Sequence, residues 1–136
     1  MFSVERIIRT RGRSLNDVTR ELSRVVEESG VRDGLANVFI RHTSASLIIS
    51  ENADPDVLRD LERFLEDIVP DGDERFVHTA EGPDDMPAHV RSVLTQTSIS
   101  IPVRGGEAQL GTWQALYLWE HRHEPHVRTL VFTVIG

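Results

Sequence analysis

Short runs of alternating apolar and polar residues recur along this chain, and they constrain its fold more than any other feature. In Ser98–Arg104 the apolar side chains Ile99, Ile101 and Val103 occupy every second position, which places them on one face of a β-strand. Val127–Ile135 is almost continuously β-branched or apolar, a composition favoured in strands. The sequence therefore predicts strands over the following ranges: 4–10, 35–42, 46–50, 98–104, 110–120 and 127–135.

Two longer helices and one short helix are expected between these strands. Ser14 has the side chain of a helix N-cap, and apolar residues follow at helical spacing as far as Gly30. Asp54-Pro55 predicts a second helix start, because the carboxylate accepts a bond from an early N–H group and proline lacks one. A short helix is predicted over about 85–94. The expected class is α+β, with an antiparallel or mixed sheet as its core and helices packed on it.

The length of the chain predicts a single domain over residues 1–136. Gly105-Gly106 is predicted to turn the chain between strands 98–104 and 110–120. No long apolar segment is present, so we expect neither a signal peptide nor a membrane span. The cytoplasm is the expected location.

Composition excludes several classes of function. The net charge is −7 at pH 7 and is spread along the chain, so the basic stripe that binds a nucleic-acid backbone is missing. All 15 basic residues are arginine, which excludes Schiff-base lysines and phosphate-loop lysines. Cysteine is absent, which excludes thiolate nucleophiles and cysteine metal sites.

The segment Phe76–Arg91 (FVHTAEGPDDMPAHVR) holds the residues best suited to chemistry. Asp85 and His89 are four positions apart, so they share a face of the expected helix. His78 precedes a Gly-Pro turn that would fold it back toward them. Two imidazoles with Asp85 or Asp84 suit a divalent metal ion, Mg²⁺ or Zn²⁺, or general acid–base catalysis near neutral pH. Alternatively, an aspartate only caps the helix and the histidines lie half exposed.

A second polar segment runs from His42 to Asn52. His42 ends an apolar strand face, where a lone histidine is more often a hydrogen-bonded core residue than a ligand. The hydroxyl groups that follow, beginning with Thr43 and Ser44, could hold phosphate or water, or they could bond to their own backbone. Glu51 and Asn52 close the segment with a carboxylate and an amide.

A third polar segment surrounds Trp113. Gly111 allows close backbone approach, beside the aromatic plane of Trp113 and the amide of Gln114. This group suits a planar heterocyclic ligand, or it packs against a neighbouring chain. The three polar segments together predict a site of three parts. The remaining histidines are predicted to lie in a solvated linker: His121, His123 and His126.

Three motifs together closely resemble the YjbQ-like family: HTSASL with Glu51-Asn52, then VHTAEGPDDMPAHV, and then LGTWQ. The resemblance covers essentially the whole chain. This family is often labelled secondary thiamine-phosphate synthase. The resemblance implies an α+β fold and a homotrimer, with a polar, histidine-containing pocket near the subunit boundary. It also implies that these are the motif positions: His42, Thr43, Ser44, Glu51, Asn52, His78, Gly82, Asp84, Asp85, His89, Gly111, Thr112, Trp113 and Gln114.

The reaction implied by the resemblance joins a hydroxymethylpyrimidine diphosphate to a thiazole phosphate and releases pyrophosphate. Its transition state separates charge, so catalysis would depend on positioning and on stabilising the departing anion. Catalytic roles are expected at His78, Asp85 and His89, and metal binding at these residues together with Asp84. The expected substrate-binding residues are His42, Thr43, Ser44, Glu51, Asn52, Gly111, Thr112, Trp113 and Gln114.

Two other functions remain open from the sequence. One is a metal-dependent hydrolase or lyase in which a metal-bound water is the nucleophile. The other is a trimer that binds a small molecule or a metal without catalysis. Only Arg41, Arg75 and Arg91 border the motifs, so few cations are available to bind a phosphorylated ligand.

Overall fold

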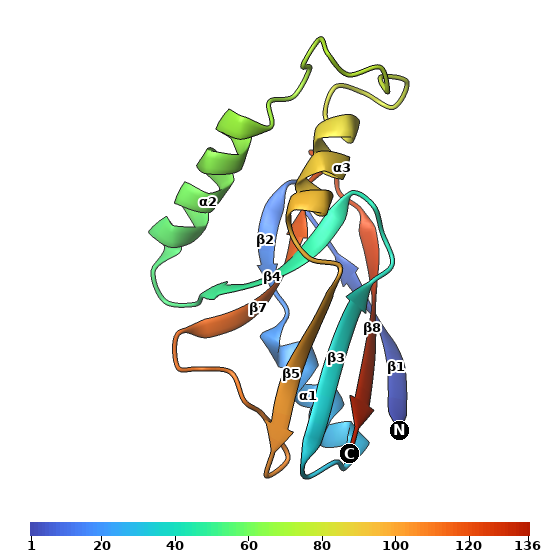
Figure 1. The fold of residues 1–136 in the computed structure, drawn as a ribbon, viewed down its shortest axis with the longest axis vertical. Coiled ribbons are helices and arrows are strands. Elements are labelled where there is room, and N and C mark those ends of the chain that lie inside the picture. The colour runs from blue at the N-terminus through green and yellow to red at the C-terminus, as the bar shows by residue number, and fades with distance from the viewer.

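The computed structural model describes residues 1–136 and has eight strands and three helices (Figure 1). The α+β class predicted from the sequence is confirmed. In chain order the elements are β1 (Phe2–Arg9), β2 (Ser14–Asp17), α1 (Thr19–Ser29), β3 (Gly34–Ile40), β4 (Ala45–Glu51), α2 (Pro55–Ile68), α3 (Asp85–Leu94), β5 (Ser98–Arg104), β6 (Glu107–Ala108), β7 (Gln114–Glu120) and β8 (Val127–Ile135).

The strands form two sheets, and every pairing within them is antiparallel. The larger sheet has the order β1-β8-β3-β5-β6, and the smaller has the order β2-β7-β4. Figure 1 shows the larger sheet along the length of the molecule, with both chain ends at its lower end. Of the two arrangements expected, antiparallel and mixed, the structure has the antiparallel one.

The hydrophobic core joins both sheets to α1 and contains 17 buried residues. Leu22 and Val25 lie on the buried side of α1, where neither is exposed to solvent. In β8, Leu130, Phe132 and Val134 alternate with partly exposed residues and are fully buried. The period of two predicted from the sequence therefore places one face of the larger sheet in the core.

The prediction of a helix starting at Ser14 is wrong. Ser14–Asp17 forms β2, which pairs with the end of β7. The helix begins at Thr19, whose backbone N–H donates to the Asp17 carboxylate at 2.9 Å. It ends at Gly30, as expected, because this glycine adopts the left-handed conformation with φ of 69°.

The expected strand 110–120 is shorter than predicted and belongs to the smaller sheet. Gly105-Gly106 closes a hairpin between β5 and the two-residue strand β6. The chain then crosses to the other sheet, where β7 begins only at Gln114. The glycine turn was predicted correctly, whereas its second strand was assigned to the wrong segment.

The two later helices frame the region that carries the predicted histidine site. Asp54 caps α2 as expected, and its side chain accepts a bond from the N–H of Asp56 at 2.9 Å. In Figure 1, α2 stands away from the sheets, and the loop 69–84 connects it over the top to α3. Neither these helices nor α1 combine the length and apolar character needed to cross a membrane.

Candidate metal centre

His78, Asp85 and His89 come together at the start of α3, and one ligand atom from each lies within 4.8 Å of the other two. Asp85 and His89 lie on successive turns of α3, and His78 reaches them from the loop 69–84. The Oδ2 atom of Asp85 is 2.6 Å from Nε2 of His78 and 3.2 Å from Nε2 of His89. One carboxylate oxygen thus faces two imidazole nitrogens.

The backbone fixes the orientation of one of these rings. Nδ1 of His89 lies 3.0 Å from the carbonyl oxygen of Thr43. A carbonyl only accepts hydrogen bonds, so Nδ1 carries the proton. In the neutral ring the lone pair is then on Nε2 and faces Asp85, and two acceptors at this distance need a proton or a cation between them. A histidine that donates its other N–H to a carbonyl is the usual arrangement of a metal ligand.

The charges in the cluster favour an ionised Asp85 carboxylate beside a protonated His78. Burial raises the pKa of Asp85, but hydrogen bonds from His78 and the charge of Arg122 outweigh it and lower that pKa overall. The hydrogen bond to Asp85 raises the pKa of His78. Without a metal the proton therefore stays on His78 to a higher pH than in a free imidazole. A metal ion would have to displace it.

Asp84 lies beside the cluster but outside it. Its Oδ2 accepts bonds from the backbone N–H of His123 at 2.9 Å and from Nε of Arg122 at 3.1 Å. Asp84 occupies the N-cap position of α3, yet its side chain makes no capping bond. Burial raises the pKa of Asp84, and the bonds from His123 and Arg122 more than offset this and lower it. The carboxylate therefore holds the loop after β7 in place, although the sequence predicted a metal ligand.

Arg122 is the part of this region that sequence reasoning missed. Its guanidinium donates to Asp84, to Oδ1 of Asp85 at 2.7 Å and to the carbonyl of Glu81 at 2.9 Å. Arg122 lies in the segment interpreted as a solvated linker, and nothing local in the sequence connects it with Asp85, 37 positions earlier. The contact depends on the end of β7 lying beside the start of α3.

The linker prediction is also wrong for His121. This side chain is fully buried and its Nε2 lies 2.8 Å from Oγ of Ser46. Burial, followed by the charge of Arg91, lowers the pKa of His121 to about 2, so the ring is neutral. His123 and His126 are at least partly exposed, as expected, at 57% and 32% of their side chains.

The segment at His42 borders the cluster from the other side. Nε2 of His42 accepts a bond from the backbone N–H of Thr129 at 2.8 Å, so this histidine is hydrogen-bonded as expected, although it is half-buried rather than in the core. Burial and the charge of Arg128 lower the pKa of His42. Ser44 accepts a bond from Arg128 at 3.0 Å. A cavity of about 350 Å³ lies beside this segment and is lined by His42, Thr43, His89, Ser92, Val93, Thr95 and Thr97.

The Trp113 segment and the Glu51-Asn52 end of the second segment do not join the cluster within one chain, although Thr43, at the other end of that segment, contacts His89. Glu51 pairs with Gln114 at one end of the β4–β7 ladder, whereas Ala45 pairs with Glu120 at the other end. Six strand residues separate these ends by roughly 20 Å. The expectation that all three segments meet in one cavity is therefore wrong for a single chain, because the length of β4 separates the Trp113 segment from the cluster.

The Trp113 loop is held by hydrogen bonds and leaves Trp113 exposed. The side chain of Asn52 donates to the carbonyl of Thr112 at 2.9 Å, and its backbone N–H donates to that of Trp113 at 3.1 Å. Gln114 accepts a bond from the N–H of Gly111 at 2.8 Å. The Trp113 side chain remains 64% exposed. The loop presents an aromatic plane that its own chain does not cover.

Comparison with known proteins places the chain in a family. The family model described as "UPF0047 protein YjbQ-like" matches residues 4–136. A UPF0047 protein of Synechocystis is 54% identical over 96% of this chain and 88% of its own length. YjbQ of Escherichia coli O157:H7 is 41% identical over 93% of this chain and 91% of its own length.

The chain belongs to the YjbQ-like UPF0047 family.

Crystal structures of a YjbQ/UPF0047 family protein and of a hypothetical protein have the same fold. The protein from Clostridium acetobutylicum superposes with a TM-score of 0.89 at 36% identity, covering 97% of this chain and 99% of its own. A hypothetical protein from Aeropyrum pernix gives 0.90 at 27% identity, covering 100% of this chain and 99% of its own. The two-sheet arrangement that positions the cluster is therefore a property of these relatives as well.

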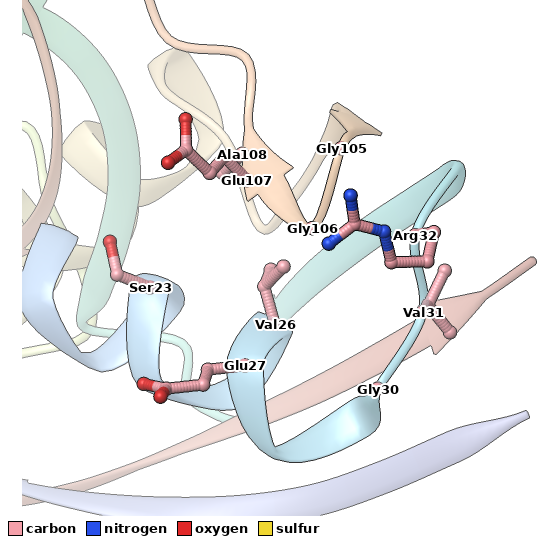
Figure 2. Close-up of a pocket in the computed structure, with 10 residues that line it drawn as sticks. All are labelled: Ser23, Val26, Glu27, Gly30, Val31, Arg32, Gly105, Gly106, Glu107 and Ala108. Atoms are coloured by element: carbon pink, nitrogen blue, oxygen red, sulfur yellow. The ribbon is translucent and has the colours of Figure 1, made fainter.

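Another cavity of this YjbQ-like chain lies away from the cluster. It has a volume of about 580 Å³ and lies between α1 and the β5–β6 hairpin (Figure 2). Figure 2 shows Arg32 on one side of it, with Glu107 and Ser23 on another. None of the predicted site residues lines it, and it contains no imidazole. The imidazoles and the buried carboxylate that suit a metal ion lie in the cluster at α3, away from this cavity.

A second cavity adjoins the cluster on the side of His78. It has a volume of about 450 Å³ and its walls include the apolar side chains of Phe76, Pro83 and Met86. His78 therefore lies between this cavity and the carboxylate of Asp85, while His89 borders the hydroxyl-lined cavity. A small molecule in either space would lie next to an imidazole of the cluster.

Proposed function

We propose that this chain is a metal-dependent enzyme acting on a small molecule, with His78, Asp85 and His89 as the ligands of one divalent metal ion. The observation that carries the proposal is the convergence of two imidazole nitrogens and one carboxylate oxygen within 4.8 Å of one another. A centre with three protein ligands leaves coordination positions open for water or substrate. Structural metal sites are usually closed by a fourth protein ligand, so three ligands favour catalysis.

The donor set favours a transition metal such as Zn²⁺ over Mg²⁺. Imidazole suits zinc and its neighbours, whereas Mg²⁺ is held mainly by oxygen ligands and water. Asp85 supplies only one oxygen atom to this centre, since its Oδ1 already accepts a bond from Arg122. The other carboxylate oxygen nearby is Oε2 of Glu81, 3.3 Å from Nε2 of His78. Of the two cofactors expected from the sequence, we therefore propose zinc.

The first reaction to consider is the one implied by the family resemblance, thiamine-phosphate synthesis. A bound metal ion supplies stabilisation of negative charge on a departing diphosphate. A histidine bound to the metal through Nε2 has no proton there to donate, so His78 or His89 would protonate the leaving oxygen only after releasing the metal. The hydroxyl-lined cavity beside His89 would position a polar substrate group. The motifs of the resemblance support this reaction.

A second reaction, metal-dependent hydrolysis or elimination, is favoured by the lack of positively charged side chains in the lining of the two cavities. Neither of the cavities beside the cluster is lined by an arginine. A site for two phosphorylated substrates normally supplies several cations. Hydrolysis requires only a metal-activated water and one bound substrate. The remaining alternative is a metal-binding trimer without catalysis.

We further propose that the protein works as a homotrimer with a small-molecule ligand, phosphorylated in the first reaction, and without nucleic acid. The Trp113 loop can approach a histidine cluster only on another chain, because the β4–β7 ladder separates the two within one chain. A site shared between subunits would bring Glu51, Asn52 and Trp113 to the substrate. The cytoplasmic location expected from the sequence stays a prediction.

Metal binding and turnover test the proposal together. Protein purified without chelators is expected to hold one zinc ion per chain, measured by elemental analysis. The double variant His78→Ala, His89→Ala should lose it, whereas His126→Ala is the matched control, since that histidine bonds to its own Glu124 carbonyl outside the cluster.

Turnover then separates the functions. Thiamine phosphate formed from the two phosphorylated substrates, and lost in Asp85→Asn with the fold intact, would select the transferase. Hydrolysis of a phosphate or carboxylic ester that depends on the same residue would select the hydrolase. Full metal binding without turnover would leave the non-catalytic trimer, and absence of metal binding would contradict the whole proposal.

A further inference from the structure

Arg122 makes three side-chain hydrogen bonds beside the cluster, as many as Asp85 makes. The side chain of Arg122, 17% exposed, donates through Nε, Nη1 and Nη2 to three different residues: Asp84, Asp85 and Glu81. Its backbone N–H donates to the Glu120 carboxylate at 3.2 Å. Both ends of Arg122 are thus fixed, and the guanidinium plane has one orientation relative to α3.

In this orientation the two oxygens of the Asp85 carboxylate have different partners. Oδ1 accepts from Nη1 of Arg122 at 2.7 Å, and Oδ2 faces the Nε2 atoms of His78 and His89. A carboxylate that binds a metal through both oxygens would have to break the contact with Arg122. Since that contact is a charge-assisted hydrogen bond in a largely buried place, breaking it is unfavourable.

We propose that Arg122 is a positioning residue that restricts Asp85 to one coordinating oxygen and thereby selects the metal. The inference rests on the metal centre proposed above. With one oxygen and two nitrogens the centre suits a four-coordinate ion such as Zn²⁺. It disfavours Ca²⁺ and Mn²⁺, which take more oxygen ligands and often both oxygens of a carboxylate. Releasing Oδ1 should weaken this preference.

A purely structural role for Arg122 makes a different prediction. Arg122 also bonds to Asp84, which anchors the backbone of His123. If Arg122 only held this loop, Asp84→Ala would impair the centre as much as a change of Arg122. If Arg122 acts on Asp85, Asp84→Ala should leave the coordination unchanged, because the bond to Oδ1 remains.

The test compares wild type, Arg122→Gln and Asp84→Ala, with Arg75→Gln as the matched control. Arg75 lies in the loop 69–84 that also carries His78, its side chain is exposed, and it pairs only with Asp73 of the same loop. The affinities for Zn²⁺ and Mn²⁺ are measured by competition titration, and the visible absorption of bound Co²⁺ reports the coordination number. The urea unfolding midpoint of each variant shows whether it is folded. If Arg122→Gln is not folded, Arg122→Lys, which keeps the charge but not the planar fork, replaces it.

We expect Arg122→Gln to lose about 10- to 100-fold in Zn²⁺ affinity while Mn²⁺ affinity falls less or rises. Its Co²⁺ absorption should weaken toward that of a five- or six-coordinate ion, and Asp84→Ala and Arg75→Gln should match wild type. An Arg122→Gln protein with the affinity and Co²⁺ spectrum of wild type would overturn the inference alone, as would an Asp84→Ala protein with the same spectral change. A wild type that binds none of these ions would instead overturn the proposed metal centre.

Discussion

At the scale of single residues, the Asp85 carboxylate determines the state of the two histidines beside it. Its Oδ2 lies 2.6 Å from His78 and 3.2 Å from His89, while Thr43 fixes the His89 ring through Nδ1. Protons and a metal ion therefore compete for the same nitrogen lone pairs. This competition makes the affinity for metal depend on pH.

Zinc affinity is expected to rise with pH. The bond to Asp85 raises the pKa of His78 above its ordinary value of 6.5, so below that raised pKa the metal has to displace a proton. The affinity should increase by up to about tenfold per pH unit for each proton displaced, and then level off. Calorimetry in two buffers of different ionisation enthalpy measures the protons released. An affinity that stays constant from pH 6 to pH 8 would contradict this account of the cluster.

Buried His121 should make the fold sensitive to acid. Its folded pKa is about 2 and its ordinary value is 6.5, so between these values the unfolded chain binds a proton that the folded chain does not. Stability therefore rises with pH in this window and falls on acidification, by at most about 1.4 kcal/mol per pH unit. Urea unfolding between pH 6.5 and 5.5 should show a smaller loss in His121→Gln than in wild type. His126→Gln is the control, and equal losses in both variants and wild type would count against the assignment.

Local sequence patterns could predict the ligands but not what holds them. Asp85 and His89 share a helix face through a spacing of four, which is visible in the sequence. Arg122 contacts Asp85 only because the end of β7 lies beside α3. The burial of His121 likewise depends on Ser46 in β4, 75 positions away. Contacts between such distant segments leave no periodic signal.

At the scale of elements, α2 is fastened to the rest of the molecule by a polar contact. Oε1 of Glu62 lies 2.5 Å from Nη1 of Arg91, and Oε2 accepts a bond from the indole N–H of Trp119 at 2.7 Å. The Arg91 side chain is fully buried, and its Nε and Nη2 atoms have no hydrogen-bond partner. Glu62 therefore neutralises the buried charge and ties α2 to α3 and β7.

Removing this carboxylate should be costly. Glu62→Ala leaves the Arg91 guanidinium buried without a counter-charge, which typically destabilises a protein by about 3–5 kcal/mol. Urea unfolding should show this loss, whereas the control Glu66→Ala, an exposed position of α2, should change stability by less than about 0.5 kcal/mol. A Glu62→Ala protein as stable as the control would mean that the pair does not hold α2.

Elements whose boundaries are set locally were predictable, and those set by pairing were not. The start of α2 follows from the Asp54-Pro55 cap, a signal contained in two residues. β2 was mistaken for a helix start because Leu15 fits a helical stripe as well as a strand. Its identity depends on pairing with Trp119, more than a hundred positions away. Only the pairing within the smaller sheet distinguishes a strand from a helix start at this segment.

At the scale of the whole molecule, one face of the larger sheet remains uncovered. Partly exposed apolar side chains lie at outward positions of β1, β3 and β8: Ile7, Leu35, Phe39, Val127 and Ile135. Exposed apolar surface of this kind is typical of proteins that associate. It fits the homotrimer expected from the family resemblance.

Light scattering coupled to gel filtration tests the assembly. The prediction is a mass of about three times the 15.4 kDa of one chain, independent of zinc. A mass of one chain at micromolar concentration would contradict both the trimer and the proposal that Trp113 reaches a site on another subunit. The cluster of His78, Asp85 and His89 would then have to bind its substrate without the Trp113 loop.

The most direct test of the central claim is anomalous diffraction at the zinc absorption edge, from crystals of protein purified without chelators. We expect one anomalous peak per chain, within coordination distance of Nε2 of His78, Oδ2 of Asp85 and Nε2 of His89. Crystals of His78→Ala protein should show no peak there. A wild-type crystal soaked in zinc that has no peak between these three atoms, or has its zinc at another place, would contradict the account.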